Sequence, residues 1–527
     1  MMKAGIASGL CFTAILTSII ASPASAEIEV FDQAILANPN NSISALYSIH
    51  GSGITSAFVE YAEAGRKSDW ENTPSFAVAS ERFVMPVLGL APETAYSMRA
   101  VLDDASGGQL TTDLIPFVTG PLPGAIDRIF DIEGSNPSEG YVIIAENDSM
   151  TLSKGFIVAL DTVGRVAWYT QLKPIMTHSI TRISEMGTIV AFAYNDYGHP
   201  FHYEIDLFGN VTALYDMPLE SGEDNLQIDN HDIILLPDGG KIFLGRSSHT
   251  IDMGAYGGPA DALVLSNFIR RTDPDESISF TWDYIDAFPL TDSNAELDDP
   301  IIDWVHANSI DLDDDGNYLI SSRSFSEVTK VDADDGSVIW RLGGKGNQFS
   351  LIGDDLGRFS LQHAAVNLGG GRILLFDNGA AHTPHQSRAV EYQLDTDAMT
   401  ATLVWEYRNN PIIYSPALSN AQRLPNGNTL INFGNPLLGK PRLIEVDPGG
   451  EPLWDLTVPF AWSYRSYKIG TLYFGVEAVS DYGDLDADGW FGHFDCDDSD
   501  VGIHPSADDP CDGVDQDCNG FDGITEI

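Results

Sequence analysis

The chain has 527 residues, which is too long for one hydrophobic core of ordinary size and predicts two to four domains. Its 77 acidic residues outnumber its 27 basic residues and give a formal net charge of −50 at pH 7. Such a charge repels nucleic acids and anionic membranes, so the sequence excludes a general polyanion-binding function. An anionic substrate would need local cationic groups, which makes each arginine or histidine near a pocket informative.

Residues 1–26 have the pattern of a secretory signal peptide. Lys3 precedes an apolar stretch from Ile6 to Ile20, and "SPASA" supplies small residues before a predicted cleavage after Ala26. A lipoprotein anchor at Cys11 is the alternative. No later stretch approaches the ~20 apolar residues that span a bilayer. We therefore expect an exported protein, periplasmic or extracellular, without a membrane span.

Residues 27–123 contain short alternating strands separated by Gly, Ser and Pro turns. The segment "FVMPVLGLAPETAYSMRAVL" resembles a fibronectin type III strand pair, with Tyr96 at the position of a corner tyrosine. This region is predicted to be a small β-sandwich that carries no visible chemistry.

Residues 124–477 contain an internal repeat, and the repeat predicts the fold. Six tight hairpins are centred on glycine: "EGYVIIAEND", "EMGTIVAFAYND", "LLPDGGKIFLGRSS", "LDDDGNYLISSRSF", "NLGGGRILLFDNG" and "RLPNGNTLINFGN". Each hairpin is followed by an outer strand pair with a polar turn, such as "GFIVALDTVGRVAWYT" or "EVTKVDADDGSVIWRL". Four strands per unit without helical periodicity are typical of propeller blades. The predicted fold class is therefore all-β: a six-bladed β-propeller preceded by the fibronectin III-like sandwich.

Residues 481–527 differ abruptly in composition, with 14 aspartates and no lysine or arginine. The segment "DLDADGWFGHFD" spaces carboxylates as in an EF-hand-type loop, with Gly489 at the sharp turn and candidate ligands at Asp484, Asp486, Asp488 and Asp495. With "DCDDSD" and "CDGVDQDCNG", the tail resembles the aspartate- and cysteine-rich calcium-type repeats of secreted bacterial proteins. We expect a small module that binds Ca²⁺; the alternative is a solvated acidic tail. An exported context also permits one disulfide among Cys496, Cys511 and Cys518.

Histidines recur at one register of separate repeats. His231 and His363 each precede their hairpin glycine by eight residues, and His306 precedes its glycine by ten. Because innermost propeller strands begin near the central channel, these side chains are predicted to converge there. His178, nine residues before its glycine, is a fourth candidate. The alternative is that each histidine only bonds neighbouring strands.

Two arginines occupy equivalent positions on the returning strands. Arg246 and Arg323 each lie seven residues after their hairpin glycine. Imidazoles beside a guanidinium favour a tetrahedral anion, whereas a zinc site built from the histidines would not need the arginines. His382 and His385 are either exposed loop residues or part of the site's rim. Trp304, Phe349 and Tyr464 could stack on an aromatic ligand or belong to the core; these roles stay open.

Five separated motifs carry a family resemblance: "DWVHANSID", "LISSR", "LQHAAV", "LLFDNG" and "SRAVEY" resemble the signature segments of the bacterial arylsulfate sulfotransferases. The resemblance covers residues 27–477. It implies an exported six-bladed propeller with a small amino-terminal sandwich that transfers sulfate from a phenol ester to another phenol by a ping-pong route, without a nucleotide donor. It also implies that His363 is the covalent nucleophile and that His306, Arg323 and His231 are catalytic.

These residue types suit sulfuryl transfer chemically. A neutral imidazole at His363 can attack sulfur and hold the group as an N-sulfonate, and Arg323, His231 and His306 can stabilise developing negative charge. His306 is the expected general acid and base, and His178 and Arg246 are expected to bind substrate. No catalytic metal or cofactor is expected. The partners would be a small aryl sulfate donor and a phenolic acceptor.

Two other functional classes remain as alternatives. Blade endings such as "GSVIWRL" are similar to the tryptophan-bearing blades of quinoproteins, although the calcium and catalytic aspartate usual in their sites have no counterpart in the predicted propeller. The other alternative is a non-catalytic adhesion or binding propeller. Such a binder would tolerate loss of His363, whereas the enzyme would not.

Overall fold

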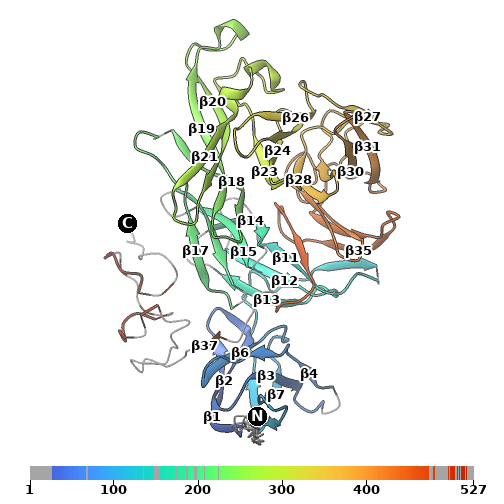
Figure 1. The fold of residues 1–527 in the computed structure, drawn as a ribbon. Helices are drawn as coiled ribbons and strands as arrows, with labels where there is room; N and C mark the ends of the chain where they lie inside the picture. The colour runs from blue at the N-terminus through green and yellow to red at the C-terminus, as the bar shows by residue number, and fades with distance from the viewer. Residues whose placement is uncertain are drawn as a thin grey trace, which may run out of the picture.

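The structure is a computed structural model, and it describes residues 27–66, 69–134, 136–147, 155–171, 176–184, 188–194, 199–206, 208–223, 225–473 and 479–480, together with 496–497, 499–504, 507, 510, 512–516 and 518. In these residues, strands predominate and only one α-helix, α1 (Tyr284–Ala287), and two 3-10 helices, η1 (Gly254–Tyr256) and η2 (Leu290–Asp292), occur. The prediction of an all-β protein is confirmed (Figure 1).

Two sheets form the amino-terminal part of the chain, drawn in blue in Figure 1. The first has the order β1-β2-β6-β37, with bounds Glu29–Asn38, Asn41–Ser52, Arg82–Val87 and Val479–Ser480. The second has the order β4-β3-β7-β8, with β5 and β9 added, and its bounds are Glu71–Asn72, Ser56–Glu63, Ala95–Asp103, Gln109–Thr111, Phe76–Ala77 and Ile115–Val118.

The inner side chains of these two sheets share one hydrophobic core, which includes Tyr47, Val59, Phe83 and Met98. The Ala91 backbone N–H donates to the Tyr96 hydroxyl at 2.8 Å, the type of bond that a corner tyrosine makes. β37 adds a strand from the far end of the chain to β6, so the segment after residue 469 returns to this part of the molecule.

Six further sheets follow in chain order, each with four or five strands. Three have their strands in simple sequence: β14-β15-β16-β17 (Met176–Ile183, Ile189–Tyr194, Pro200–Ile205, Val211–Tyr215), β18-β19-β20-β21 (Leu226–Leu235, Lys241–Ile251, Ala262–Thr272, Ile278–Asp283) with β22 (Ile301–Asp303) on β20, and β23-β24-β25-β26 (Ala307–Leu312, Tyr318–Ser322, Glu327–Val331, Val338–Gly343). A fourth is β28-β29-β30-β31 (His363–Gly369, Arg372–Asp377, Arg388–Asp395, Thr400–Tyr407) with β27 (Ser350–Ile352) on its outer edge.

The remaining two sheets combine strands from the two ends of this region. β36 (Tyr467–Ile469) pairs with β11 (Tyr141–Ala145), followed by β12 (Phe156–Leu160) and β13 (Val166–Gln171). β10 (Asp131–Gly134) pairs with β35 (Pro452–Thr457), followed by β34 (Arg442–Val446), β33 (Thr429–Phe433) and β32 (Asn420–Arg423). The prediction that "EGYVIIAEND" forms a hairpin around its glycine is therefore wrong, because the strand that pairs with β11 on the side opposite β12 comes from the other end of the region.

The first strands of successive sheets pack side by side: β11 against β14, β14 against β18, β18 against β23, β23 against β28, and β28 against β32. Gln422 of β32 and Lys468 of β36 exchange two hydrogen bonds, at 3.0 and 2.7 Å. The contacts therefore run in a closed circle, and the sheets surround a common centre in Figure 1.

The hairpin of β23 and β24 illustrates why the sequence folds locally in this way. In "DLDDDGNYL", Gly316 adopts a φ of 80°, a left-handed conformation that glycine accepts without strain, and the Asp313 N–H donates to the Asn317 carbonyl. The turn fixes the pairing of Leu312 with Tyr318. That register sets which residues at the other end of β23 and β24 face each other.

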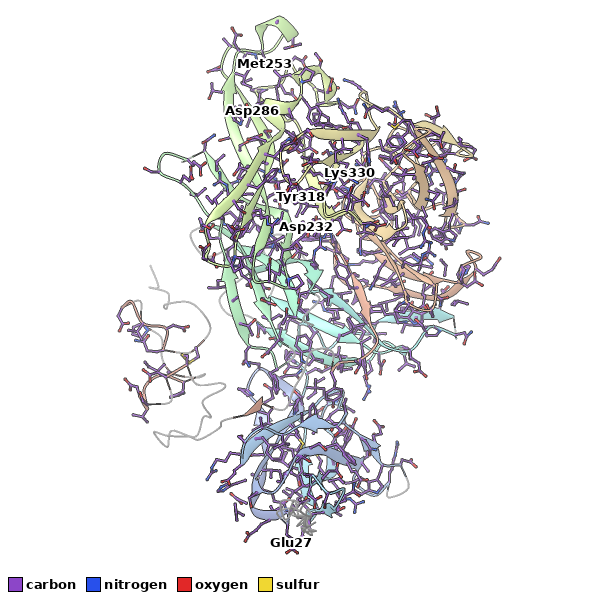
Figure 2. The ribbon with its side chains drawn as sticks, viewed as in Figure 1. Glu27, Asp232, Met253, Asp286, Tyr318 and Lys330 are labelled. Carbon is purple, nitrogen blue, oxygen red and sulfur yellow. A yellow bond between two sulfur atoms is a disulfide. The ribbon has the colours of Figure 1, made fainter. Side chains whose placement is uncertain are left out.

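A buried ion-pair network occupies the centre of the circle. The Asp232 carboxylate, labelled in Figure 2, receives Arg465 at 3.2 Å and Arg182 at 3.4 Å. Arg465 also donates to the backbone carbonyls of Thr181 and Asn308. Arg465 thereby connects the inner strands of three sheets, β14, β18 and β23.

The carboxy-terminal tail is described only in part. Its described residues include a disulfide between Cys496 and Cys518; Cys511 and the candidate metal ligands Asp484, Asp486, Asp488 and Asp495 lie outside the described residues, as does the predicted signal peptide. Across the portions that the structure describes, no helix has the length and hydropathy needed to cross a membrane.

Candidate active site

Three of the predicted histidines lie together, and each comes from a different sheet. His231 lies within β18, His306 directly precedes β23, and His363 begins β28. The ring centroids of His231 and His306 are 5.0 Å apart, and those of His306 and His363 are 6.1 Å apart. The register argument from the hairpin glycines thus places these three side chains correctly.

Each imidazole is held through its Nδ1 atom. His231 Nδ1 lies 2.5 Å from Asp229 Oδ1, His306 Nδ1 bonds Asp303 Oδ2, and His363 Nδ1 lies 2.7 Å from Asn378 Oδ1. Carboxylate and amide oxygens only accept, so each Nδ1 carries the hydrogen and donates it. When neutral, all three rings therefore present the lone pair on Nε2.

Burial favours the neutral form of His363, and it also lowers the pKa of His231 against the opposing charge of Asp229. Burial, followed by the proximity of His306 and Arg323, holds the pKa of His363 well below its ordinary value of 6.5. Burial raises the pKa of Asp303, but the hydrogen bond from His306 and the charges of His306, Arg246 and His231 together lower it below its ordinary value. The site thus pairs one uncharged imidazole with a carboxylate-backed neighbour.

The two predicted arginines have different surroundings. Arg246 forms an ion pair with Asp229 at 3.1 Å, and Asp229 in turn holds His231. Although burial raises it, the pKa of Asp229 is held far below its ordinary value by His231 and Arg246. Arg323 has a buried Nε without a hydrogen-bond partner among the described residues, and burial lowers its pKa. A buried, unpartnered guanidinium nitrogen beside His363 is suited to receive an anionic oxygen.

The backbone around His363 is held in an uncommon conformation. Leu361 and Ala364 have φ values of 52° and 53°, and His306 has a φ of 51°. Asn308 bonds both sides of His363: its Nδ2 donates to the Gln362 carbonyl at 2.7 Å, and its Oδ1 accepts from the Ala364 N–H at 3.2 Å. Left-handed non-glycine residues persist only where surrounding bonds enforce them, and they are common at active sites.

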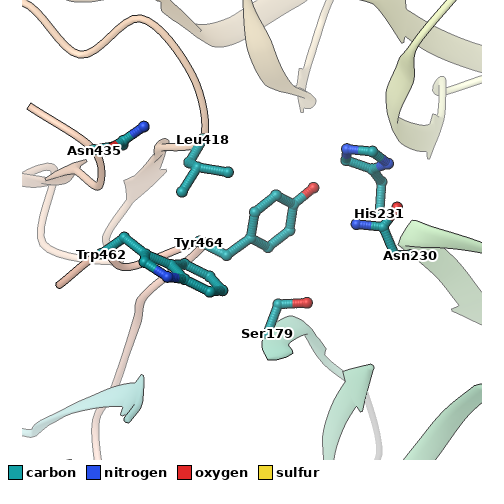
Figure 3. A pocket seen from close by; sticks show the side chains of 7 residues that line it. All are labelled: Ser179, Asn230, His231, Leu418, Asn435, Trp462 and Tyr464. Atoms are coloured by element: carbon teal, nitrogen blue, oxygen red, sulfur yellow. The ribbon is translucent and has the colours of Figure 1, made fainter. Parts of the chain in front are cut away.

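A cavity of about 320 Å³ opens beside His231 (Figure 3). Leu418, Trp462 and Tyr464 supply apolar walls, and Figure 3 shows the Tyr464 hydroxyl directed to the His231 side of the cavity. This hydroxyl and Ser179 Oγ are buried without hydrogen-bond partners among the described residues. The cavity can therefore accept an aromatic ring that carries a polar substituent.

The aromatic candidates separate into core and cavity residues. Trp304 is fully buried, and its indole N–H donates to the Leu290 carbonyl; Phe349 is buried in the core of the neighbouring sheet. Tyr464 alone of these three lines the cavity. His382 is buried and bonds Asp377, whereas His385 stacks on Tyr414 at 5.0 Å. His178 lies in β14, but its side chain is outside the described part.

The sequence reasoning missed the three residues that hold the imidazoles: Asp229, Asp303 and Asn378. Asp229 precedes His231 by two residues and Asp303 precedes His306 by three. An acidic residue this close in the sequence could have predicted a carboxylate partner for each of these histidines. Asn378 lies 15 residues after His363. Only the pairing of β28 with β29 brings it close.

No group of three or more His, Cys, Asp or Glu side chains able to hold a metal is found in the described portion of the chain. Within the described tail, the Asp497 carboxylate accepts from Ser499, and that of Asp512 accepts from Gln516. These oxygens are hard donors of the kind that Ca²⁺ prefers, but those described do not gather into a site.

Comparison with known proteins identifies the family. The profile of the Arylsulfotransferase (ASST) family matches residues 133–465, which is more than half of the chain and includes all three histidines. The chain belongs to this family. A curated relative, arylsulfate sulfotransferase AssT from Escherichia coli O6:H1, is 22% identical over 373 residues. That match covers 55% of this chain and 60% of the relative.

Residues 495–522 match a second family, described as "Putative metal-binding motif" (Cu-binding MopE). Among solved structures, a Bacteroides caccae protein of unknown function is 15% identical, covers 63% of this chain and all of its own, and has a TM-score of 0.41. A virginiamycin B lyase from Staphylococcus aureus is 11% identical with the same coverage and a TM-score of 0.30. Neither likeness carries an argument about fold or function.

Proposed function

We propose that this protein is an exported aryl sulfotransferase that moves a sulfuryl group from a phenolic sulfate ester to a phenolic acceptor through a sulfohistidine at His363. One observation carries the proposal: a buried, uncharged imidazole with its Nε2 lone pair available lies beside a guanidinium whose Nε has no partner among the described residues. Family membership supports the sulfuryl group as the group transferred. No nucleotide sulfate donor takes part in this scheme.

In the first half-reaction, His363 Nε2 attacks the sulfur of the aryl sulfate. The N–S bond forms while the bond between sulfur and the aryl oxygen breaks, and the bonding electron pair leaves with that oxygen. Arg323 stabilises the sulfuryl oxygens where charge accumulates. Protonated His306, supported by Asp303, donates its Nε2 proton to the departing phenolate, so a neutral phenol leaves.

The second half-reaction runs in the opposite direction with a different phenol. Neutral His306 takes the proton of the acceptor hydroxyl, and the acceptor oxygen attacks sulfur. The N–S bond breaks, and its electron pair returns to His363 Nε2. His231, held by Asp229, donates a hydrogen bond to the transferred group when it is protonated, and the cavity beside it holds the aromatic ring.

We further propose that residues 124–477 form a six-bladed β-propeller and residues 27–123 a fibronectin III-like sandwich. The closed circle of six sheets and the two sheets that share one core support this assignment. Exchange of strands β10 and β36 between the ends of the region would close the circle. In this arrangement, the central channel carries the histidines at one mouth and the Asp232 network below them.

The decisive experiment is incubation of the mature protein with 4-nitrophenyl sulfate, with and without phenol, followed by intact-mass measurement of wild type and His363→Ala. We expect nitrophenolate release that depends on phenol and an added SO₃ on the wild type that the variant lacks. Release without phenol dependence would indicate a hydrolase. Absence of both release and adduct with several aryl sulfates would favour a non-catalytic binding protein.

We also propose that the carboxy-terminal tail binds Ca²⁺ and that the protein is exported. The Cys496–Cys518 disulfide is of a kind that persists in oxidising compartments outside the cytosol. Metal analysis of the full-length protein after dialysis against a mixture of Ca²⁺ and Cu²⁺ tests the metal. Calcium at about one or more equivalents supports the proposal, whereas selective copper retention would overturn it.

A further inference from the structure

The three imidazoles differ in the group that accepts from Nδ1. His231 and His306 donate to carboxylates, Asp229 and Asp303, whereas His363 donates to the neutral amide of Asn378. A carboxylate stabilises an imidazolium, but a neutral amide does so far less. The difference therefore gives His231 and His306 a neighbouring counter-charge that His363 lacks.

Asn378 cannot readily turn its amide to offer the opposite atom. Its Nδ2 donates to the backbone carbonyls of Ser415 at 2.7 Å and Leu418 at 3.2 Å. A flipped amide would place its oxygen against two carbonyl oxygens and its NH₂ against His363. The network therefore assigns Oδ1 to the His363 side, which requires a hydrogen on His363 Nδ1.

The surroundings fix Asn378 itself. The residue is fully buried, and it directly follows Asp377, the last residue of β29, whose carboxylate is held by Arg388 at 2.9 Å. The Ser387 hydroxyl donates to the Asn378 carbonyl at 2.8 Å. These contacts fix the position of the Asn378 amide without a bound substrate.

We propose that Asn378 is a positioning residue that locks His363 in the Nδ1–H tautomer, and that its neutral amide makes His363 the nucleophile while the carboxylate-backed His306 transfers the phenol proton. This inference rests on the proposed function, because it explains which of three adjacent imidazoles receives the sulfuryl group. The groups that face His363 are His306, Arg323, His231 and Asn378, and no carboxylate contacts it among the described residues.

The first test needs no turnover. Long-range ¹H–¹⁵N spectra of histidine-labelled protein, with the His363 signals assigned by their loss in His363→Ala, report which ring nitrogen is protonated. We expect a single Nδ1–H tautomer in the wild type and an averaged or Nε2–H signal in Asn378→Leu. An Nε2–H tautomer or a mixture in the wild type would overturn the proposal.

The second test is a reciprocal exchange of the supporting groups. Asn378→Asp should raise the pH at which His363 becomes protonated, move the acidic limb of kcat/KM to higher pH, and lower kcat about 10²-fold near pH 6 with little change in KM. Asp303→Asn, the matched control, should leave the His363 titration nearly unchanged. An unshifted His363 titration in folded Asn378→Asp refutes the inference. If Asn378→Asp does not fold, the spectra of the wild type and Asn378→Leu decide.

These outcomes separate the inference from the proposed function. A protein without sulfuryl transfer but with a locked Nδ1–H tautomer would retain the role of Asn378 and refute the enzyme. Transfer through His363 with the opposite tautomer would retain the enzyme and refute the role of Asn378.

Discussion

Replacement of Arg323 should lower the rate of sulfuryl transfer without lowering the free energy of unfolding. Its backbone N–H donates to the His306 carbonyl at 3.0 Å, a bond that any residue retains, while its buried Nε lacks a partner among the described residues. Removing one preorganised donor to developing charge typically lowers the rate about 10²–10³-fold. We therefore expect Arg323→Met to lower phenol-dependent nitrophenolate release by that factor, equivalent to about 3–4 kcal/mol of transition-state stabilisation.

The same substitution should leave the free energy of unfolding unchanged or slightly higher, because it removes a donor that is buried without a bond. Urea unfolding followed by fluorescence measures this. Arg246→Met is the matched control: it deprives buried Asp229 of an ion pair and should destabilise the protein by about 1–3 kcal/mol. A loss of stability in Arg323→Met equal to that in Arg246→Met, or a rate within fivefold of the wild type, would refute the reasoning.

Three other predictions concern two buried polar groups and one wall of the cavity. Burial lowers the pKa of His202 to about 4, so protonation of this side chain favours the unfolded chain. Between pH 6.5 and 4, the wild type should therefore lose roughly 3 kcal/mol more stability than His202→Gln, as measured by urea unfolding. Parallel pH profiles of the two proteins would contradict this. Arg388→Met leaves the buried carboxylates of Asp354 and Asp377 without their cation and should lower the free energy of unfolding in urea by about 3–5 kcal/mol. An unchanged free energy of unfolding would show that these carboxylates become protonated without loss of stability. Trp462→Ala should raise KM for naphthyl sulfate about tenfold with kcat nearly unchanged, since it removes a wall of the cavity; an equal KM would place the ring elsewhere.

Local patterns predicted much of this molecule because turn chemistry and strand period act over a few residues. Gly239, Gly316 and Gly371 close their hairpins with the positive φ expected of turn glycines, and the strands that follow pair antiparallel with the strands before them. Counting from these glycines located His231, His306 and His363, because the register of an antiparallel hairpin is fixed by its turn.

Long-range pairing could not be obtained in the same way. Besides β12, β11 pairs with β36, which lies more than 300 residues later, and nothing local in "EGYVIIAEND" distinguishes this segment from the genuine hairpins. Likewise, the hydrogen bond between Asn378 and His363 depends on the pairing of β28 with β29, which brings together residues 15 positions apart. The sequence also does not distinguish the roles of the two aromatic residues Trp304 and Tyr464. Tertiary packing places Trp304 in the core and Tyr464 in the wall of the cavity.

The charge of the chain gives the position of Arg323 its significance. Near the centre of the circle, Arg182 and Arg465 are paired with Asp232, and Arg246 with Asp229. Arg323 has no ion pair in the portion of the chain that the structure describes, although it lies in a protein with a net charge of −50. Burial opposes its charge and lowers its pKa, and the nearby Asp303 carboxylate offsets only part of that cost. A bound sulfate ester would supply a counter-charge for Arg323. This local attraction would oppose the repulsion between the anionic substrate and the negatively charged protein.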